Sequence, residues 1–118
     1  MRSVLIVDDN ADLLDVLSEV LLSEGLYSVH LARTGAEALA LYAAVDPALV
    51  ILDEGLSDMA GSELLRRLRT ANAHASRPAL FVTGALRSVS CLPGDVVLEK
   101  PVDLRRLLTA VAALLPQA

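Results

Sequence analysis

The sequence alternates between two hydrophobic periods, and this alternation constrains the fold more than any other feature. Short apolar runs rich in β-branched residues lie at residues 4–7, 27–32, 49–52, 78–83 and 96–98. Runs of this length are typical of strands buried on both faces of a sheet. Between them, leucines recur every three or four residues, as in an amphipathic helix. Strands that alternate with helices predict a parallel α/β sheet, because a crossover between parallel strands needs a connection of helix length.

Local signals mark where the helices begin and end. Gly25 is a stop signal after the first helix, Thr34 and Glu37 have the spacing of a capping box, and Asp103 can cap the last helix. The interval 84–95 differs, because its serines are moderate helix formers and a Pro-Gly pair favours a turn. We therefore predict a short or irregular connection between the fourth and fifth strands.

The composition predicts one soluble domain over residues 1–118 with no output domain. The chain is 54% hydrophobic and 21% charged, which excludes a disordered protein. Its net charge of −5 would repel a phosphate backbone, so we expect no direct binding of nucleic acid. The single Cys91 cannot form an internal disulfide, and no apolar run reaches the ~18 residues of a membrane helix. We expect a cytoplasmic protein that does not bind membranes.

Polar side chains follow the strands at their expected carboxyl ends. Asp8 and Asp9 follow the first run and Asp53 follows the third. Thr83 ends the fourth run, and Lys100 comes soon after the fifth. Sites in open parallel sheets form at this edge. Neighbouring carboxylates repel one another, and a hard divalent cation such as Mg²⁺ relieves the repulsion. A carboxylate beside a cation, a lysine and a hydroxyl is equipped to accept a phosphoryl group.

At these residues the sequence resembles the response-regulator receiver (CheY-like) domains of two-component signalling. The matching motifs are Val4-Leu5-Ile6-Val7-Asp8-Asp9-Asn10, Val50-Ile51-Leu52-Asp53, then Leu56, Asp58 and Gly61, then Phe81-Val82-Thr83-Gly84, and Lys100-Pro101. Each motif alone is weak, whereas all five in register along nearly the whole chain are a strong signal. The resemblance implies a flavodoxin-like, doubly wound (βα)5 sheet with strand order 2-1-3-4-5.

The resemblance also implies how a phosphoryl group would be handled. Asp53 would take it from the phosphohistidine of a sensor histidine kinase or a phosphotransfer protein. Lys100 would bridge to Asp53 and then to the phosphoryl oxygens, and the Thr83 hydroxyl would move toward the phosphate. The backbone N–H groups of Gly55 and Gly84 would also contact it. The output would be a protein contact or onward relay, from a self-phosphorylating and autodephosphorylating switch rather than a turnover enzyme.

The cofactor implied by the resemblance is Mg²⁺. Asp9, Asp53 and the backbone carbonyl of Gly55 would ligate the ion directly, and Asp8 would act through a water molecule. The bland alternative is that Asp8 and Asp9 only cap the first helix, where negative charge is favoured. That alternative leaves Asp53 and Lys100 unexplained.

Two departures from the family pattern concern the output. Val97 stands where an aromatic residue is typical, and the interval from Thr83 to Lys100 is shorter than usual. Together with the Phe-x-Thr-Gly motif, they resemble single-domain receivers with a malleable fourth helix. Our hypothesis is that the segment 84–95 becomes ordered when Thr83 moves.

Further departures lie around the third strand and the last one. Glu54 is an acid where the family prefers an apolar residue, and Ala60 lacks a helix-capping side chain typically worth ~1 kcal/mol. Ser57 stands where the family commonly has proline, and Val102 where it often has phenylalanine. None of these changes removes a catalytic group.

Other functions stay open as alternatives. One is a pseudo-receiver, an interaction module that works without phosphorylation. Another is a phosphatase of the haloacid dehalogenase type, but that needs an acid two residues after the nucleophile, where this chain has Gly55. We expect His30 and His74 to be surface or hydrogen-bonded histidines and Cys91 to be structural or incidental. We expect the remaining candidates to form a solvated helix face, namely Arg66, Arg67 and Arg69.

Overall fold

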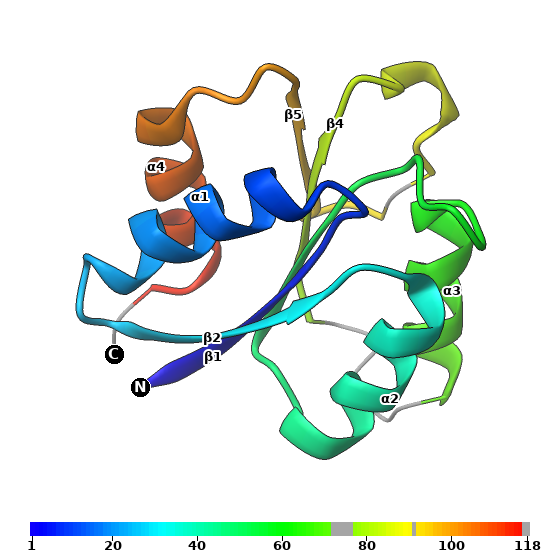
Figure 1. Ribbon diagram of the computed structural model, residues 1–118, viewed down its shortest axis with the longest axis horizontal. Coiled ribbons are helices and arrows are strands. Elements are labelled where there is room, and N and C mark those ends of the chain that lie inside the picture. Colours follow the sequence, from blue (N-terminus) through cyan, green and yellow to red (C-terminus); the bar gives the residue numbers. More distant parts are fainter. Residues whose placement is uncertain (72–76, 91, 117–118) are drawn as a thin grey trace.

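The apolar runs form a five-stranded parallel sheet in the order β2-β1-β3-β4-β5, which confirms the predicted strand order (Figure 1). The computed structural model describes residues 1–71, 77–90 and 92–116. The elements are β1 (Arg2–Val7), α1 (Ala11–Leu22), β2 (Tyr27–Ala32), α2 (Gly35–Val45), β3 (Leu49–Leu52), α3 (Gly61–Ala71), β4 (Ala79–Thr83), a 3₁₀ turn η1 (Leu86–Ser88), β5 (Val96–Glu99) and α4 (Leu104–Leu114).

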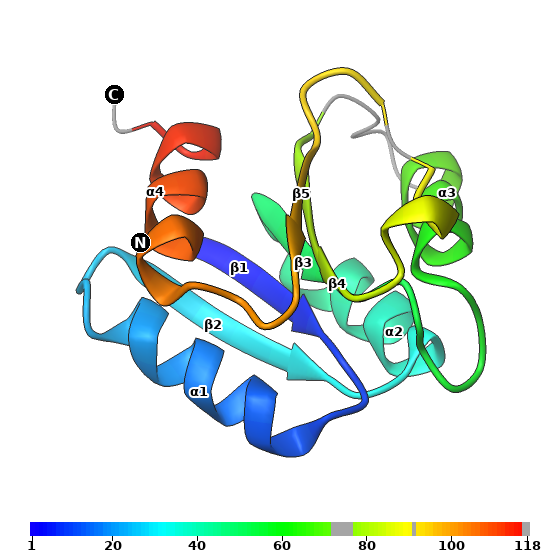
Figure 2. The ribbon, with the colours of Figure 1, turned by 90° about the horizontal axis from the view of Figure 1, so that it is seen from above.

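Helices cover both faces of the sheet (Figure 2). Side chains of β1 alternate between the faces, so that Val4 and Ile6 pack with α1 and α4, whereas Leu5 and Val7 pack with α2 and α3. All four are at most 1% exposed. Burial on both faces is the physical reason why these runs are apolar throughout rather than alternating.

The chain reverses its direction of winding between β1 and β3. These two strands are neighbours, and Val7 pairs with Leu52 at their carboxyl ends. Because α1, which follows β1, lies on one face and α3, which follows β3, lies on the other, the loops after the two strands diverge and leave room between them. Ligands of doubly wound sheets bind at such a switch point. Asp8 and Asp53 follow Val7 and Leu52 directly, so they lie at this place.

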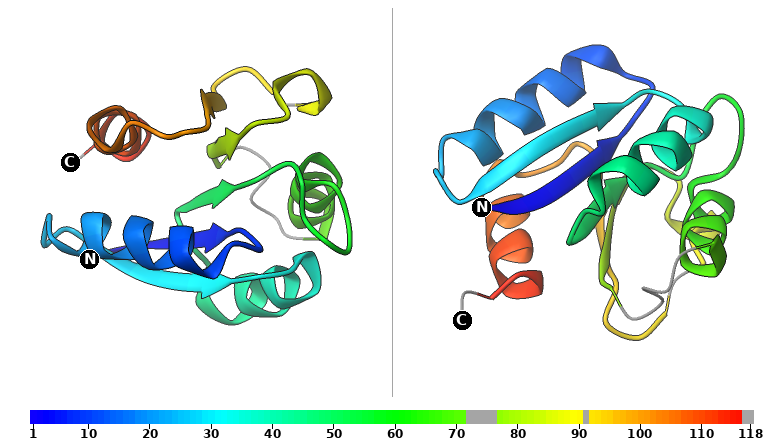
Figure 3. Two further views of the ribbon diagram at one scale, coloured as in Figure 1. Left: turned by 45° about the horizontal axis from the view of Figure 1, so that its top comes forward. Right: turned by 90° about the horizontal axis from the view of Figure 1, so that it is seen from below.

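The connection from β4 to β5 is shorter than the other crossovers, as predicted. In its described residues, 84–90 and 92–95, the one helical element is η1, and the connection passes beside α3 (Figure 3). Residues 84–88 are all exposed. Among the described residues, the (βα)5 pattern therefore has four α-helices instead of five.

Several local predictions are confirmed. The Thr34 side chain accepts the backbone N–H of Glu37 at the start of α2, and Asp103 accepts two N–H groups at the start of α4.

His30 lies partly buried in β2, opposite Leu5. His74 and Cys91 fall outside the described residues. No helix in the described ranges is both long and apolar enough to cross a membrane.

Candidate functional site

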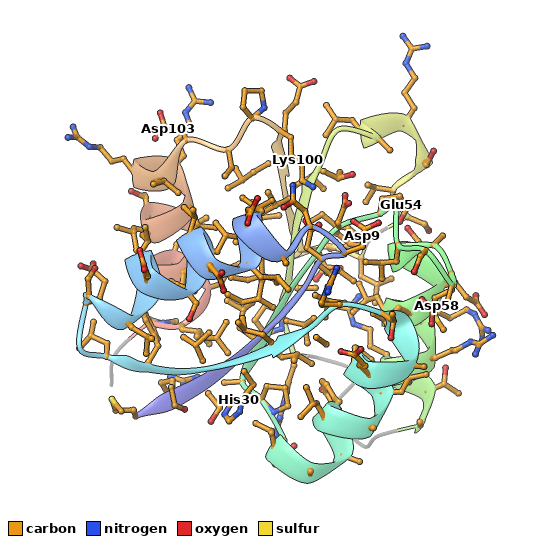
Figure 4. The ribbon with its side chains drawn as sticks, in the orientation of Figure 1. Asp9, His30, Glu54, Asp58, Lys100 and Asp103 are labelled. Atoms are coloured by element: carbon orange, nitrogen blue, oxygen red, sulfur yellow. The ribbon has the colours of Figure 1, made fainter. Side chains whose placement is uncertain are left out.

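Two buried carboxylates from neighbouring strands meet one lysine at the carboxyl ends of the sheet. Lys100 follows β5, and its Nζ lies 2.9 Å from Asp8 Oδ2 and 3.3 Å from Asp53 Oδ2. Asp8 and Asp53 are 3% and 8% exposed, so the carboxylates of both ion pairs are shielded from solvent, whereas the Lys100 side chain is 27% exposed. In Figure 4 the Lys100 side chain points toward the end of β1, close to Asp9.

Asp9 adds a third carboxylate, and it is exposed. Asp8, Asp9 and Asp53 each offer one oxygen, and the three oxygens lie within 4.8 Å of one another. An all-oxygen donor set of this spacing fits a hard cation such as Mg²⁺. The exposed Asp9 leaves the cluster open to an ion from solvent.

The charges at this site are not balanced by the protein alone. Burial raises the pKa of Asp8 above its ordinary value, and the hydrogen bonds from Asn10 and Lys100 offset only part of that cost. Burial alone would lower the pKa of Lys100, but its contacts with Asp8 and Asp53 outweigh burial and raise it. Lys100 therefore stays protonated, facing more negative charge than it can neutralise.

Asp8 and Asp9 do not cap the first helix, so the alternative that they only do so is wrong. The N-cap of α1 is Asn10, whose side chain accepts the backbone N–H of Leu13. Asp8 instead accepts the N–H of Asn10 at 2.9 Å with one oxygen, which turns its other oxygen toward Lys100.

Thr83 lies at the end of β4, beside the lysine. Its side chain is buried, and its carbonyl oxygen accepts the backbone N–H of Lys100 at 3.0 Å. Its hydroxyl accepts the N–H of Ala85 at 3.0 Å, which closes a tight turn. Gly84, within this turn, is exposed and has open space where a side chain would be.

The loop after β3 is held in shape by the elements around it. Gly55 pairs with Ala60 in an antiparallel bridge, and a Cβ on Gly55 would lie 3.8 Å from Asp53 Oδ2. Gly61 begins α3 so close to Asp53 that any side chain would collide with the Asp53 carbonyl oxygen. These contacts fix the backbone that carries Asp53.

Asp58, in the same loop, ties it to helix α2. Its two carboxylate oxygens accept the backbone N–H groups of Gly35 and Ala36 at 2.8 and 3.0 Å. Those hydrogen bonds lower the pKa of Asp58. The sequence motif assigned no role to Asp58. Its partner Gly35 lies 23 positions earlier in the chain, and the spacing of residues within a motif does not reveal a contact of that kind.

Glu54 is a residue whose role the sequence did not indicate. Its side chain turns to α3, where Oε1 accepts the backbone N–H of Ser62 at 2.6 Å and the Ser62 hydroxyl at 2.8 Å. Glu54 thus caps α3 in place of Ala60, which has no capping group. Glu54 and Ala60, which both depart from the family pattern, therefore belong to one local arrangement. The signal available in the sequence was a helix start without a capping side chain, close to an acid that the family does not usually have.

The prediction of a solvated arginine face on α3 is correct for two residues and wrong for the third. Arg66 and Arg67 pair with Glu63 at the surface and lower the pKa of that carboxyl to about 2. Arg69 turns inward instead, and its buried guanidinium binds Asp95 through two hydrogen bonds of 2.8 and 2.6 Å.

Comparison with known proteins agrees with this arrangement. The family model of the response regulator receiver domain matches residues 4–112. The transcriptional regulatory protein TrcR of Mycobacterium tuberculosis is 33% identical over 117 residues, covering 95% of this chain and 44% of that protein. The sensory transduction protein RegX3 of Mycolicibacterium smegmatis is 32% identical over 120 residues, covering 98% of this chain and 51% of that protein. The chain spans about half the length of these relatives.

Solved structures show the same architecture. A two-component response regulator from Clostridium difficile superposes with a TM-score of 0.84 at 28% identity, covering 99% of this chain and 98% of that one. The chemotaxis response regulator CheY4 of Vibrio cholerae gives 0.82 at 26% identity, with 97% and 98% covered. With its motifs at the carboxyl ends of a sheet of order 2-1-3-4-5, the chain belongs to the response regulator receiver domain family.

Proposed function

We propose that this receiver domain accepts a phosphoryl group on Asp53 from the phosphohistidine of a sensor histidine kinase or phosphotransfer protein in the cytoplasm. The observation that carries the proposal is the position of the Asp53 carboxylate, 3.3 Å from Lys100 Nζ and clustered with Asp8 and Asp9. The phosphorylated form would change a contact with a downstream protein or pass the group onward.

In this reaction a carboxylate oxygen of Asp53 attacks phosphorus. The new O–P bond replaces the P–N bond of phosphohistidine, and the imidazole leaves and takes a proton from solvent. Lys100 neutralises charge on the phosphoryl oxygens as it withdraws from Asp53 Oδ2. Burial at the sheet edge limits access of water to the acyl phosphate.

Receiver domains bind Mg²⁺ through acidic residues. Here Asp9, Asp53 and the Gly55 carbonyl would hold the ion, with Asp8 acting through a water molecule. When bound, Mg²⁺ neutralises phosphoryl charge and relieves repulsion among the carboxylates. The geometry supports this assignment, because Asp8, Asp9 and Asp53 each offer a carboxylate oxygen and the three oxygens lie within 4.8 Å of one another.

The Thr83 hydroxyl would respond to the new phosphoryl group. It now accepts the N–H of Ala85 through a lone pair, so its proton can be donated to a phosphoryl oxygen, and a shift of the side chain toward that oxygen would disturb the turn. The turn connects directly to η1 and the segment 84–95. Movement of Thr83 would therefore rearrange the start of this segment, where residues 84–88 are exposed and include the short 3₁₀ turn η1, in a protein where Val97 replaces the usual aromatic ring.

The test is intact mass after incubation with a small acyl phosphate, with and without Mg²⁺. We expect one added phosphoryl group on wild type and on Asp15→Asn, an exposed carboxylate of α1 that serves as the matched control. Asp53→Asn should gain none. An adduct of equal yield on Asp53→Asn would contradict the proposal.

The second candidate is a pseudo-receiver that binds its partner without phosphorylation. It would be favoured by absence of any adduct on wild type together with partner binding that is undiminished in Asp53→Asn. Turnover of a phosphate ester beyond one equivalent would instead favour a phosphatase.

A further inference from the structure

A chain of hydrogen bonds leads from the neighbour of the phosphoacceptor to the connection between β4 and β5. It begins at Glu54, which follows Asp53 in sequence and is 5% exposed. Its Oε1 accepts both the backbone N–H and the hydroxyl of Ser62, at 2.6 and 2.8 Å. In Figure 4, Glu54 lies beside the start of α3.

The same serine also holds the other segment. Ser62 Oγ accepts the backbone N–H of Ser90 at 2.7 Å. A hydroxyl has one proton to donate and lone pairs to accept. The Ser62 hydroxyl donates its proton to Glu54, and one of its lone pairs accepts the backbone N–H of Ser90. Ser62 is therefore a junction between the loop of Asp53 and a segment 28 positions later in the chain.

We propose that the Glu54–Ser62–Ser90 hydrogen-bond chain couples phosphorylation of Asp53 to the β4–β5 connection. This inference rests on the proposed function, and it assigns Ser62 as a positioning residue. The connection is held at three points, at Thr83 by its strand, at Ser90 by Ser62 and at Asp95 by Arg69. Thr83 would respond to the phosphoryl group and Glu54 directly follows Asp53, so two of these three points would respond to one event.

This contact also forms part of a cavity wall. Ser62 and Ser90, together with Leu65 and Leu92, line a cavity of about 540 Å³ between α3 and the connection. A change in the Ser62–Ser90 contact alters that wall. The coupling thus ends at a surface hollow rather than at an aromatic side chain, which Val97 cannot provide.

The experiment compares Ser62→Ala with Ser88→Ala, which removes an exposed hydroxyl from the same connection without touching the chain of hydrogen bonds. Amide exchange across residues 84–90 is measured with and without the phosphoryl mimic beryllium trifluoride and Mg²⁺. Intact mass after acyl phosphate treatment is measured on the same samples. Ser62→Thr keeps a hydroxyl and tests rescue.

In wild type and Ser88→Ala we expect the mimic to change exchange in the connection. In unphosphorylated Ser62→Ala, the Ser90 amide should exchange about fivefold to tenfold faster, as for the loss of one hydrogen bond. The response to the mimic should also be lost at Ser90, although one phosphoryl group still adds to Asp53. Ser62→Thr should restore the response.

A Ser62→Ala protein that is phosphorylated and shows the wild-type response would overturn the coupling and leave the proposed function intact. Absence of any adduct on wild type would overturn both. Should Ser62→Ala not fold, Glu54→Gln serves instead, because it keeps an acceptor for α3 but removes the charge that strengthens the hydroxyl bond. Unchanged protection of Ser90 in Glu54→Gln would count against the coupling.

Discussion

Asp8 and Asp95 are both buried carboxylates paired with a cation, but they lie at opposite ends of the sheet and their pKa values shift in opposite directions. Asp95 precedes β5 and pairs with Arg69 at the amino ends of the strands, where its side chain is 1% exposed. Asp8 follows β1 and pairs with Lys100 at the carboxyl ends, with a side chain 4% exposed. Burial is therefore similar, and the partners make the difference.

Asp95 has enough donors to offset its burial. Arg69 binds both carboxylate oxygens, and the backbone N–H groups of Ala79 and Leu92 donate to them at 3.0 and 2.9 Å. Burial alone would raise the pKa of Asp95, but these four hydrogen bonds lower it. The pair joins α3 to the starts of β4 and β5.

Asp8 has fewer donors, and its lysine is shared. One N–H from Asn10 and one contact from Lys100 reach Asp8, while Lys100 also serves Asp53. The pKa of Asp8 consequently rises. The comparison teaches that the carboxylate at one end of the sheet has enough donors to offset its burial, whereas the carboxylates at the other end would gain from an added cation.

Breaking the ion pair between Arg69 and Asp95 should have the largest effect on the free energy of unfolding. Arg69→Met leaves the Asp95 carboxylate buried with two N–H donors and removes the hydrogen bond from Arg69 to the Arg77 carbonyl. We expect urea denaturation to show a loss of about 3 kcal/mol in the free energy of unfolding. The control Arg66→Met removes an exposed pair of the same helix and should leave stability unchanged. A similar loss of unfolding free energy in Arg69→Met and Arg66→Met would contradict the distinction between the buried and the exposed ion pair.

The lowered pKa of Asp95 predicts a pH dependence with a definite sign. The unfolded state binds this proton more readily than the folded state, so stability from Asp95 is complete above its ordinary pKa of 3.8. It is lost as the pH falls through the lowered folded pKa. The unfolding free energy of wild type minus that of Asp95→Asn should shrink by about 1 kcal/mol on acidification. Other acids are common to both proteins and cancel, and a difference that grows in acid would show the sign to be wrong.

A smaller effect of opposite sign is expected at the carboxyl ends. Asp8→Asn replaces an insufficiently neutralised carboxylate by a neutral side chain of similar shape. In the absence of divalent cations, the free energy of unfolding should rise by about 0.5–1 kcal/mol, while phosphorylation of Asp53 weakens. Denaturation and intact mass on one preparation measure both. A loss of stability would mean that Lys100 already balances the site.

The sequence predicts this end of the sheet better than the other. Asp8, Asp53 and Lys100 directly follow strands, and parallel strands bring their carboxyl ends to one edge, so their proximity follows from topology. The bounds of β2 and β3 and the missing crossover helix also follow from local patterns.

Arg69 and Glu54 show where such prediction stops. Arg69 follows Leu68 at the boundary of the apolar stripe, and its contacts with Asp95, 26 residues later, and with the Arg77 carbonyl hold it inward. Glu54 depends on the path of the loop that leads to Ser62. Both contacts join segments by tertiary packing, which the hydrophobic period does not reveal, although the acid at Glu54 beside the uncapped start of α3 was a signal for one of them.

The central claim, that the carboxylates at the carboxyl ends need a cation, is tested most directly by unfolding measurements over a range of Mg²⁺ concentrations. A ligand that binds only the folded state raises the free energy of unfolding with the logarithm of its concentration once the site begins to fill. We predict this rise for wild type and for Asp15→Asn, and its loss in Asp9→Asn, whose exposed carboxylate completes the cluster. An equal rise in Asp9→Asn, or no rise in wild type, would contradict the account.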